Sequence, residues 1–246
     1  MEKKIALVTG GMGGIGHAIS RELYHQGRRV VAAYSRAQDV ALAWQAEEKK
    51  AGYDFDIAYA NVTDFSSCET MIKKIENEVG PIDILINNAG IHRDHTCCKM
   101  SKDEWDSVIN TDLNSVFYMT RAVINGMKDR HYGRIINISS INGQKGQYGQ
   151  VNYSAAKAGI HGFTKALALE VAKHGITVNT VSPGYVATEM VLSIPKEVLD
   201  KIIADIPMNR LATPEEVAHV ITFLADEKNG YITGANIAIN GGHYML

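Results

Sequence analysis

Short runs of apolar, mostly β-branched residues alternate with longer amphipathic stretches along this chain. Near-continuous apolar runs of this length are typical of strands that are buried on both faces of a parallel sheet. The runs predict seven strands, over Ile5–Thr9, Arg29–Tyr34, Asp56–Tyr59, Ile82–Ile86, Arg134–Ile138, Ile176–Val181 and Asn236–Ile239. The amphipathic stretches predict helices over Gly14–Gln26, Ala37–Lys50, Ser66–Val79, Ser101–Lys128, Asn152–His174 and Pro214–Ala225.

This alternation of strands and helices predicts an α/β protein. The expected architecture is a doubly wound, Rossmann-type parallel sheet of about seven strands, with helices on both faces. Because no linker, repeat or low-complexity tract interrupts the pattern, residues 1–246 are expected to form a single domain. A short helix over Lys196–Asp205 is predicted as well, either as part of a lid over the site or as a surface helix.

Composition excludes two classes of partner. The chain has 246 residues, of which 46% are hydrophobic and 21% charged, as in ordinary folded proteins. Its net charge of −2 argues against a nucleic-acid partner, which would favour a basic excess. No apolar stretch approaches about 18 residues, the length of a membrane span, so we expect no membrane partner.

The three cysteines are Cys68, Cys97 and Cys98. An odd number, with two of the three adjacent, argues against a disulfide framework and favours a reducing, cytoplasmic compartment. His92 and His95 share a loop with Cys97 and Cys98, but no partner cluster with metal-ligand spacing accompanies them. We therefore expect no metal site and interpret these side chains as the rim of a pocket.

A glycine-rich loop directly follows the first predicted strand and opens the first predicted helix. It reads Thr9-Gly10-Gly11-Met12-Gly13-Gly14-Ile15-Gly16. In this arrangement the backbone N–H groups and the helix N-terminus bind a pyrophosphate, whereas the alternative is a tight turn with no ligand. The expected contacts of a dinucleotide are Gly10, Met12, Gly13, Gly14, Ile15 and Gly16.

The end of the second predicted strand indicates which dinucleotide binds. Folds that bind NAD usually carry a carboxylate there for the ribose 2′-hydroxyl, but this strand ends in Tyr34-Ser35-Arg36. A guanidinium can hold a 2′-phosphate through two hydrogen bonds, while a carboxylate would repel it. We therefore predict that the cofactor is NADP(H), bound by Ser35 and Arg36. The alternative is that Arg36 is a solvated loop cation.

Catalytic chemistry is indicated by Tyr153 and Lys157, which lie one turn apart on the same face of a predicted helix. A phenol has a pKa near 10, and a nearby ammonium lowers that pKa by favouring the phenolate. Ser140 follows the fifth predicted strand, at the carboxyl edge where open α/β sheets bind ligands. Its hydroxyl can donate a hydrogen bond to a substrate carbonyl.

Five motifs in this order and spacing resemble those of the short-chain dehydrogenase/reductase family, over essentially the whole chain. They are Thr9-Gly10 with Gly14-Ile15-Gly16, Asn87-Asn88-Ala89-Gly90, Ser140, Tyr153 with Lys157, and Pro183-Gly184 followed by Thr188. The resemblance implies an oxidoreductase in which Tyr153 is the general acid/base and Ser140 orients the carbonyl. It also implies that Lys157 binds the nicotinamide ribose and lowers the pKa of Tyr153.

The same resemblance implies further cofactor contacts. Asn61 and Val62 would flank the adenine. Other expected contacts are Asn88, Ala89, Gly90, Ile91, Pro183 and Gly184, with Val186 and Thr188 at the nicotinamide amide.

One position departs from the family pattern. The family's fourth catalytic residue is an asparagine in a Thr-Asn-Leu context, and the matching residue here is Asp112. Asn114, two residues further, points to another face of the helix and cannot replace it. Asp112 could serve as the asparagine does if the backbone carbonyl at this position carries the role.

Within the family, the chain looks most like the acetoacetyl-CoA reductases of bacterial polyhydroxybutyrate synthesis. The resemblance rests on Thr9–Gly16, on residues 141–150 and on the ending Asn240-Gly241-Gly242-His243. It implies NADPH-dependent reduction of acetoacetyl-CoA, a 3-oxoacyl-CoA thioester, to (R)-3-hydroxybutyryl-CoA. The expected substrate contacts are Asp94, Ser140, Gln147, Tyr148, Gln150, Gly184 and Tyr185. For each glutamine, a hydrogen bond that closes the loop is the alternative.

Two other functions stay open. A 3-oxoacyl-acyl-carrier-protein reductase of fatty acid synthesis would hold its acidic partner with basic residues, and Arg130 and Lys173 are the candidates. A non-catalytic NADP-binding regulatory protein is more remote, because Ser140, Tyr153 and Lys157 are all present.

The family resemblance also implies a homotetramer, built through the helices over Ser101–Lys128 and Asn152–His174 and through the C-terminal strand. These helices carry more apolar residues than one sheet face is expected to bury. The examples are Val116, Tyr118, Met119, Phe163 and Leu167. We expect closed D₂ symmetry.

Overall fold

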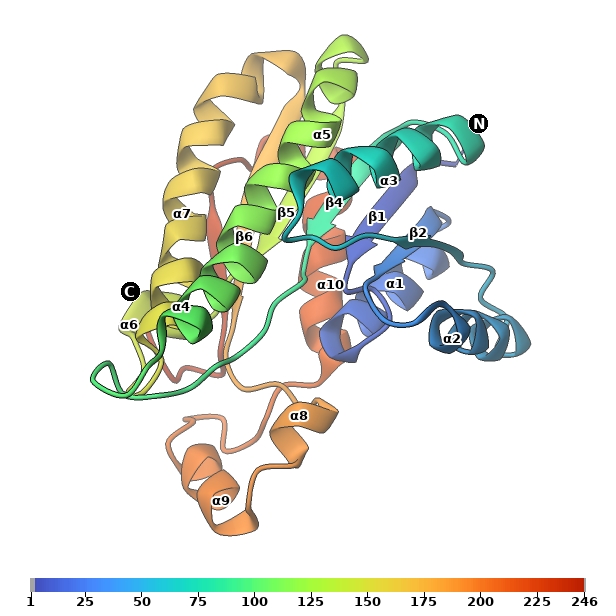
Figure 1. Ribbon diagram of the computed structural model, residues 1–246. Coiled ribbons are helices and arrows are strands. Elements are labelled where there is room, and N and C mark those ends of the chain that lie inside the picture. The colour runs from blue at the N-terminus through green and yellow to red at the C-terminus, as the bar shows by residue number, and fades with distance from the viewer. Residues whose placement is uncertain (1–2, 246) are drawn as a thin grey trace.

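A computed structural model of the chain, which describes residues 3–245, contains seven strands in one parallel sheet (Figure 1). The strands are β1 (Ile5–Thr9), β2 (Arg29–Tyr34), β3 (Asp56–Tyr59), β4 (Ile82–Asn87), β5 (Gly133–Ile138), β6 (Ile176–Pro183) and β7 (Asn236–Ile239). Their order across the sheet is β3-β2-β1-β4-β5-β6-β7. This confirms the fold class that the apolar runs predict, and four strands have the predicted bounds.

Helices connect the strands and cover both faces of the sheet. They are α1 (Gly14–His25), α2 (Gln38–Lys50), α3 (Phe65–Glu78), α4 (Lys102–Ile109), α5 (Ser115–Asp129), α6 (Asn142–Lys145), α7 (Val151–Val171), α8 (Glu189–Leu192), α9 (Lys196–Ala204) and α10 (Pro214–Ala225). The single-turn helices α6 and α8 escape prediction because they are too short to show a period. None of the helices within residues 3–245 is long and apolar enough to cross a membrane.

The helix predicted over Ser101–Lys128 is interrupted. Ser101 caps α4 as expected, since its hydroxyl accepts from the N–H of Glu104 while the Glu104 carboxylate accepts from the N–H of Ser101. Between α4 and α5 the chain forms a π-helical turn over Asn110–Asn114. A π-helical turn contains one residue more than an α-helical turn, which changes the direction in which its side chains point. Asp112 lies in this turn and is fully buried.

The strands divide their side chains between two hydrophobic cores, because successive residues of a strand point to opposite faces. Ile5 and Leu7 belong to the core beneath α3, α5 and α7. Ala6 and Val8 belong to the core beneath α1 and α10. Figure 1 shows these two helical layers on either side of the sheet. Burial on both faces explains why the strands read as continuous apolar runs.

A chain of buried polar side chains fixes α7 against the sheet. Asn87 of β4 donates to Asn137 of β5 (2.8 Å), and Asn137 donates to Thr164 of α7 (2.9 Å). Thr180 of β6 donates to the same Thr164 hydroxyl (2.8 Å). Because buried polar groups without partners are costly, this chain allows α7 few alternative positions over β4, β5 and β6.

The loops that follow β1 and β4 are joined by hydrogen bonds. The hydroxyl of Thr9 accepts from the backbone N–H groups of Asn88 (2.9 Å) and Ala89 (3.0 Å). The Asn88 amide in turn donates to the carbonyl of Thr9 (2.9 Å). The strand order reverses direction between β1 and β4, and ligands of open α/β sheets bind at such a point.

Gly16 is where this packing is tightest. A Cβ atom at Gly16 would lie 2.1 Å from the carbonyl oxygen of Gly10 and 2.6 Å from the Asn88 amide. We expect Gly16→Ala to displace the glycine loop, to weaken dinucleotide binding at least about tenfold and to lower the melting temperature. Fluorescence titration with NADPH and thermal unfolding measure both effects.

Gly27→Ala is the matched control at the other end of α1. A Cβ atom there meets nothing within 4 Å, although the φ of +79° costs about 1–2 kcal/mol for any other residue. Gly27→Ala should therefore lower stability modestly and leave dinucleotide binding intact. Equal binding losses in the two variants would contradict the steric account of Gly16.

Candidate active site

The glycine loop presents its backbone at the N-terminus of α1. Gly13 is the N-cap residue of the helix, and Gly10 and Gly14 have positive φ angles of 62° and 45°. A Cβ atom at Gly14 would lie 3.3 Å from the methyl group of Thr188, so Thr188 lies next to the loop. Free N–H groups at a helix N-terminus, with no side chain in the way, fit a pyrophosphate.

An open pocket of about 580 Å³ lies beside the glycine loop at the end of β2. It is lined by Tyr34, Ser35, Arg36, Ala37, Gln38 and Tyr59. The Arg36 guanidinium reaches back toward the loop, since a Cβ atom at Gly13 would be 3.7 Å from it. Asn61 and Val62 follow β3, whose Tyr59 pairs with Tyr34 of β2, so both lie at the same edge of the sheet.

Tyr153 and Lys157 lie on one face of α7 and are almost inaccessible to solvent, with 8% and 4% of their surfaces exposed. The Lys157 ammonium donates to the carbonyl of Ile138 (3.0 Å) and lies 5.4 Å from the centre of the Tyr153 ring. Ser140 is buried next to them, and its hydroxyl accepts from the N–H of Asn142 (3.1 Å). The structure therefore brings the three predicted catalytic residues together at the carboxyl edge of β5.

Lys157 lowers the pKa of Tyr153, as expected, but burial outweighs it and the net direction is upward. Burial raises the pKa of Tyr153, and the nearby Lys157 ammonium is the largest opposing effect. A hydrogen bond from Ser140 also lowers this pKa, while the Asp112 carboxylate raises it. Because the net direction is upward, the phenol keeps its proton in the pH range where it has to donate one.

His92 is closer to the catalytic residues than the sequence indicates. Its ring lies 4.2 Å from the Tyr153 ring, centre to centre, so this partly exposed side chain also contacts the candidate catalytic tyrosine. Burial lowers the pKa of His92, which favours the neutral imidazole. Only its position two residues after Gly90 could have indicated this contact. Asn152 was missed too: its amide donates to the carbonyl of Arg93 (2.9 Å) and ties the same loop to α7.

The residues predicted to contact substrate lie in three different settings. The Gln150 amide donates to Asp94 (2.7 Å) and accepts from Asn142 (2.9 Å). It therefore makes the loop-closing hydrogen bonds that were the alternative to a substrate contact. The side chain of Tyr148 is 86% exposed, and Gln147 is exposed next to it. Gly184 follows β6, and the half-buried Tyr185 ring stacks against His243 at 5.9 Å.

Comparison with known proteins identifies the family. The family described as short chain dehydrogenase matches residues 4–198. The chain belongs to this family. It is 54% identical to the acetoacetyl-CoA reductase of Cupriavidus necator, over 100% of both chains. It is 52% identical to the acetoacetyl-CoA reductase of Allochromatium vinosum, over 98% of this chain and 99% of the relative. The chain is 44% identical to the 3-oxoacyl-acyl-carrier-protein reductase of Vibrio harveyi, over 100% of this chain and 99% of the relative.

Membership confirms the expected oxidoreductase and implies a nicotinamide cofactor. The residues of the chain fit such a group, because four glycines expose the backbone of the loop and Arg36, which lines the neighbouring pocket, reaches toward it. Within residues 3–245, no three or more His, Cys, Asp or Glu side chains are grouped as a metal site would require.

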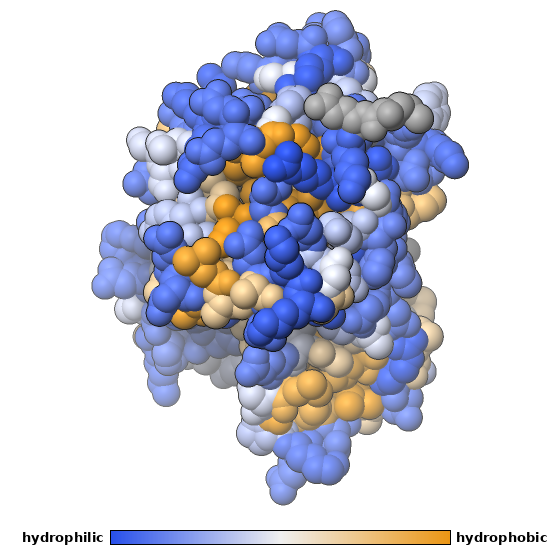
Figure 2. Space-filling view, turned by 90° about the vertical axis from the view of Figure 1, so that its right-hand side faces the viewer, coloured by the Kyte–Doolittle hydropathy of each residue, from blue (hydrophilic) through white to orange (hydrophobic). Residues whose placement is uncertain are grey.

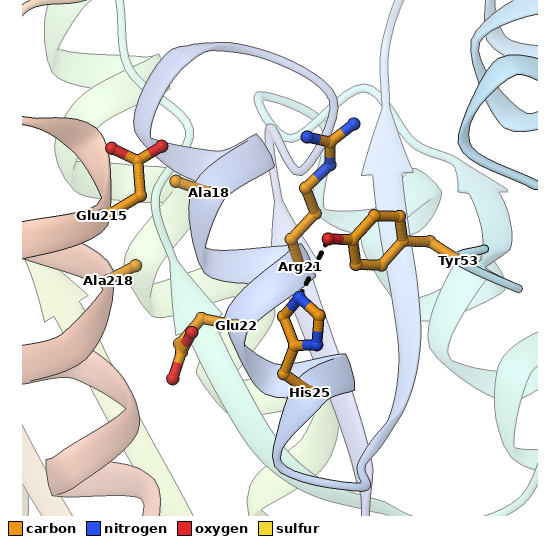
Figure 3. A pocket seen from close by; sticks show the side chains of 7 residues that line it. All are labelled: Ala18, Arg21, Glu22, His25, Tyr53, Glu215 and Ala218. Atoms are coloured by element: carbon orange, nitrogen blue, oxygen red, sulfur yellow. Dashed lines mark hydrogen bonds between the residues drawn. The ribbon is translucent and has the colours of Figure 1, made fainter. Parts of the chain in front are cut away.

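A second, smaller pocket of about 190 Å³ lies between α1 and α10 (Figure 3). Its residues are Ala18, Arg21, Glu22, His25, Tyr53, Glu215 and Ala218. His25 and Tyr53 share a hydrogen bond (2.9 Å) across it. None of the catalytic residues lines this pocket, and it is too small for a dinucleotide.

The segment with α8 and α9 projects from the body at the end of the molecule where α4 and α6 lie (Figure 1). Its exposed apolar side chains include Met190, Leu192 and Val198. Figure 2 shows apolar side chains gathered at the level of this segment. This exposed apolar surface therefore lies on the segment for which the sequence predicts either a lid or a surface helix.

Proposed function

We propose that this protein is an NADPH-dependent reductase that converts acetoacetyl-CoA into (R)-3-hydroxybutyryl-CoA in the cytoplasm, as a step of polyhydroxybutyrate synthesis. Relatives with the name acetoacetyl-CoA reductase that match the chain over its full length support the substrate. The observation that carries the reaction type is the buried cluster of Ser140, Tyr153 and Lys157 next to the glycine loop. An NADP-binding regulatory protein would have no need of such a cluster.

The cluster performs the proton chemistry of carbonyl reduction. A reduced nicotinamide cofactor, when bound, supplies the hydride that converts the 3-oxo carbon into an alkoxide carbon. The Ser140 hydroxyl donates a hydrogen bond to the carbonyl oxygen and orients it. Tyr153 transfers its phenol proton to the developing alkoxide, and the Lys157 ammonium stabilises the phenolate that remains.

Preference for NADPH over NADH is supported by the pocket at the end of β2. Ser35 and Arg36 line it, and no carboxylate stands in the position that would contact a ribose 2′-hydroxyl. A 2′-phosphate carries close to two negative charges, which a guanidinium at the pocket edge stabilises. Arg36 therefore acts as a phosphate ligand in this proposal.

A CoA thioester is favoured over a carrier-protein thioester by the position of Arg130. Its guanidinium donates to the carbonyl of Ile82 (2.6 Å) and lies 4.0 Å from the Asp83 carboxylate. A side chain engaged within its own chain is a poor contact for an acidic partner. The net charge of −2 supplies no basic field to attract one either.

Assembly as a homotetramer is part of the proposal, with one correction to the residues. Val116 and Met119 are not spare apolar surface, because both are buried beneath the helices of their own chain. The most exposed large apolar residues of α5 and α7 are Phe117 (50% exposed) and Leu169 (86% exposed). These two side chains lie on the helices through which the family resemblance implies subunit contacts.

The role of Tyr153 is tested by Tyr153→Phe, which removes the proton and keeps the ring. We expect kcat to fall by roughly 10²–10⁴ while NADPH still binds. Steady-state rates and fluorescence titration measure the two quantities. Tyr231→Phe, at a fully exposed tyrosine, is the control and should retain normal rates. Near-normal turnover of Tyr153→Phe would reject the assignment.

Substrate and cofactor are tested by kcat/KM for four pairs, each cofactor with acetoacetyl-CoA and with acetoacetyl-carrier protein. The proposal predicts the highest value for NADPH with acetoacetyl-CoA. A preference of tenfold or more for the carrier protein, about 1.4 kcal/mol in transition-state binding, would overturn the substrate. Tyr34→Asp should blunt or reverse the preference for NADPH, because the new carboxylate repels the 2′-phosphate.

The mass of the protein in solution tests the assembly. Light scattering at micromolar concentration should give four times the chain mass of 26.9 kDa. Leu169→Glu places a charge on the most exposed apolar residue of α7 and should shift the mass toward dimer or monomer. A monomeric mass for the unmodified protein refutes the tetramer.

A further inference from the structure

Asp112 makes two contacts in the interior of the active site. It is fully buried, and one of its carboxylate oxygens accepts from the backbone N–H of Ile91 (2.9 Å). The other oxygen lies 3.2 Å from the Lys157 ammonium nitrogen, which is ion-pair distance. One oxygen thus accepts a hydrogen bond from the backbone, and the other forms the ion pair with Lys157.

Two features of the chain make room for this carboxylate. The π-helical turn over Asn110–Asn114 directs the side chain of Asp112 into the interior. The residue that faces this side chain is Gly90, which has no side chain of its own. A Cβ atom at Gly90 would lie 2.7 Å from the Asp112 oxygen and 3.4 Å from the Lys157 nitrogen. Any side chain at Gly90 would therefore push the two charges apart.

We propose that Asp112 is a positioning residue, whose carboxylate holds the Lys157 ammonium in place. As a consequence, the Tyr153–Lys157 pair loses its first proton at a higher pH than it would without this carboxylate. The inference rests on the proposed function, because it assigns Tyr153 as the proton donor. It goes beyond that function in giving the aspartate a role that an uncharged asparagine at this position would not have.

The groups around Tyr153 support the direction of the effect. Lys157 faces it from α7, Asp112 from the π-helical turn, Ser140 from the loop after β5, and His92 and Asp94 from the loop after β4. The Asp112 carboxylate raises the pKa of Tyr153 and that of Lys157.

Tyr153 and Lys157 titrate as a coupled pair, so the change concerns both. Removal of a buried negative charge makes each of them lose its proton more readily. Both effects therefore move the first titration of the pair in the same direction, toward lower pH.

The test compares Asp112→Asn with the unmodified protein in two measurements. The first measures the phenolate absorbance of the cofactor-free protein as a function of pH. The Tyr153→Phe substitution is also made in the unmodified protein and in Asp112→Asn, and the titration of each is subtracted to isolate the signal of Tyr153. The second follows kcat for NADPH-dependent reduction of acetoacetyl-CoA with pH. In Asp112→Asn, the midpoint of the phenolate titration and the alkaline limb of the kcat profile should both move to lower pH by about one unit or more. One pH unit corresponds to a tenfold change in the phenolate-to-phenol ratio at a given pH.

Asp103→Asn is the matched control, because it removes the same charge from an exposed position on α4 and should leave both curves in place. Asp112→Ala is the second variant and should shift the curves the same way. Unchanged or upward-shifted midpoints in folded Asp112 variants would overturn the inference. If acetoacetyl-CoA is not reduced at all, the proposed function fails, while the phenolate titration of the cofactor-free protein still decides the role of Asp112.

Discussion

A lysine ammonium removed from water is the constraint around which this active site is built. Lys157 is 4% exposed, and an unpaired charge at such a position would cost several kcal/mol. The cost is offset by the Ile138 carbonyl at 3.0 Å and the Asp112 carboxylate at 3.2 Å. The π-helical turn and the missing side chain of Gly90 both serve to bring that carboxylate to the ammonium.

The same cluster is connected to the cofactor cradle through the backbone. Asp112 binds the N–H of Ile91, and the preceding Asn88 binds the carbonyl of Thr9 at the start of the glycine loop. The Asn88 amide also lies where a side chain at Gly16 would have to go. The Lys157–Asp112 ion pair and the hydrogen bonds made by the segment Asn88–Ile91 therefore link α7 to the glycine loop.

Most of the fold could be predicted from the sequence, because burial on both faces makes each strand a run of apolar residues. The glycine loop, Ser140, Tyr153 and Lys157 could be predicted as well, since short spacings place them on one strand end or one helix face. What could not be predicted depends on contacts between distant segments. The His92 ring lies against the Tyr153 ring, and Gln150 binds Asp94, only because the loop after β4 packs against the start of α7.

The interruption of the long helix was equally hidden. Residues 101–128 show one amphipathic period, so a single helix was the expected structure, yet one extra residue in the turn over Asn110–Asn114 buries Asp112. Likewise, Val116 and Met119 look like surplus apolar residues, yet both are buried on α5, and Met119 belongs to the core that α5 shares with α3. The burial of Asp112 and that of Val116 and Met119 both depend on helix register and packing, which the hydrophobic pattern of the sequence does not contain.

In the proposed reaction, a reduced nicotinamide supplies the hydride to the 3-oxo carbon and the protein completes the alcohol with a proton. Its most direct measurement uses NADPH that carries deuterium at the transferable position of the nicotinamide, with acetoacetyl-CoA, and mass spectrometry of the product. The account predicts 3-hydroxybutyryl-CoA with a single deuterium on the hydroxyl-bearing carbon. A product without deuterium, or no product despite bound NADPH, would contradict it.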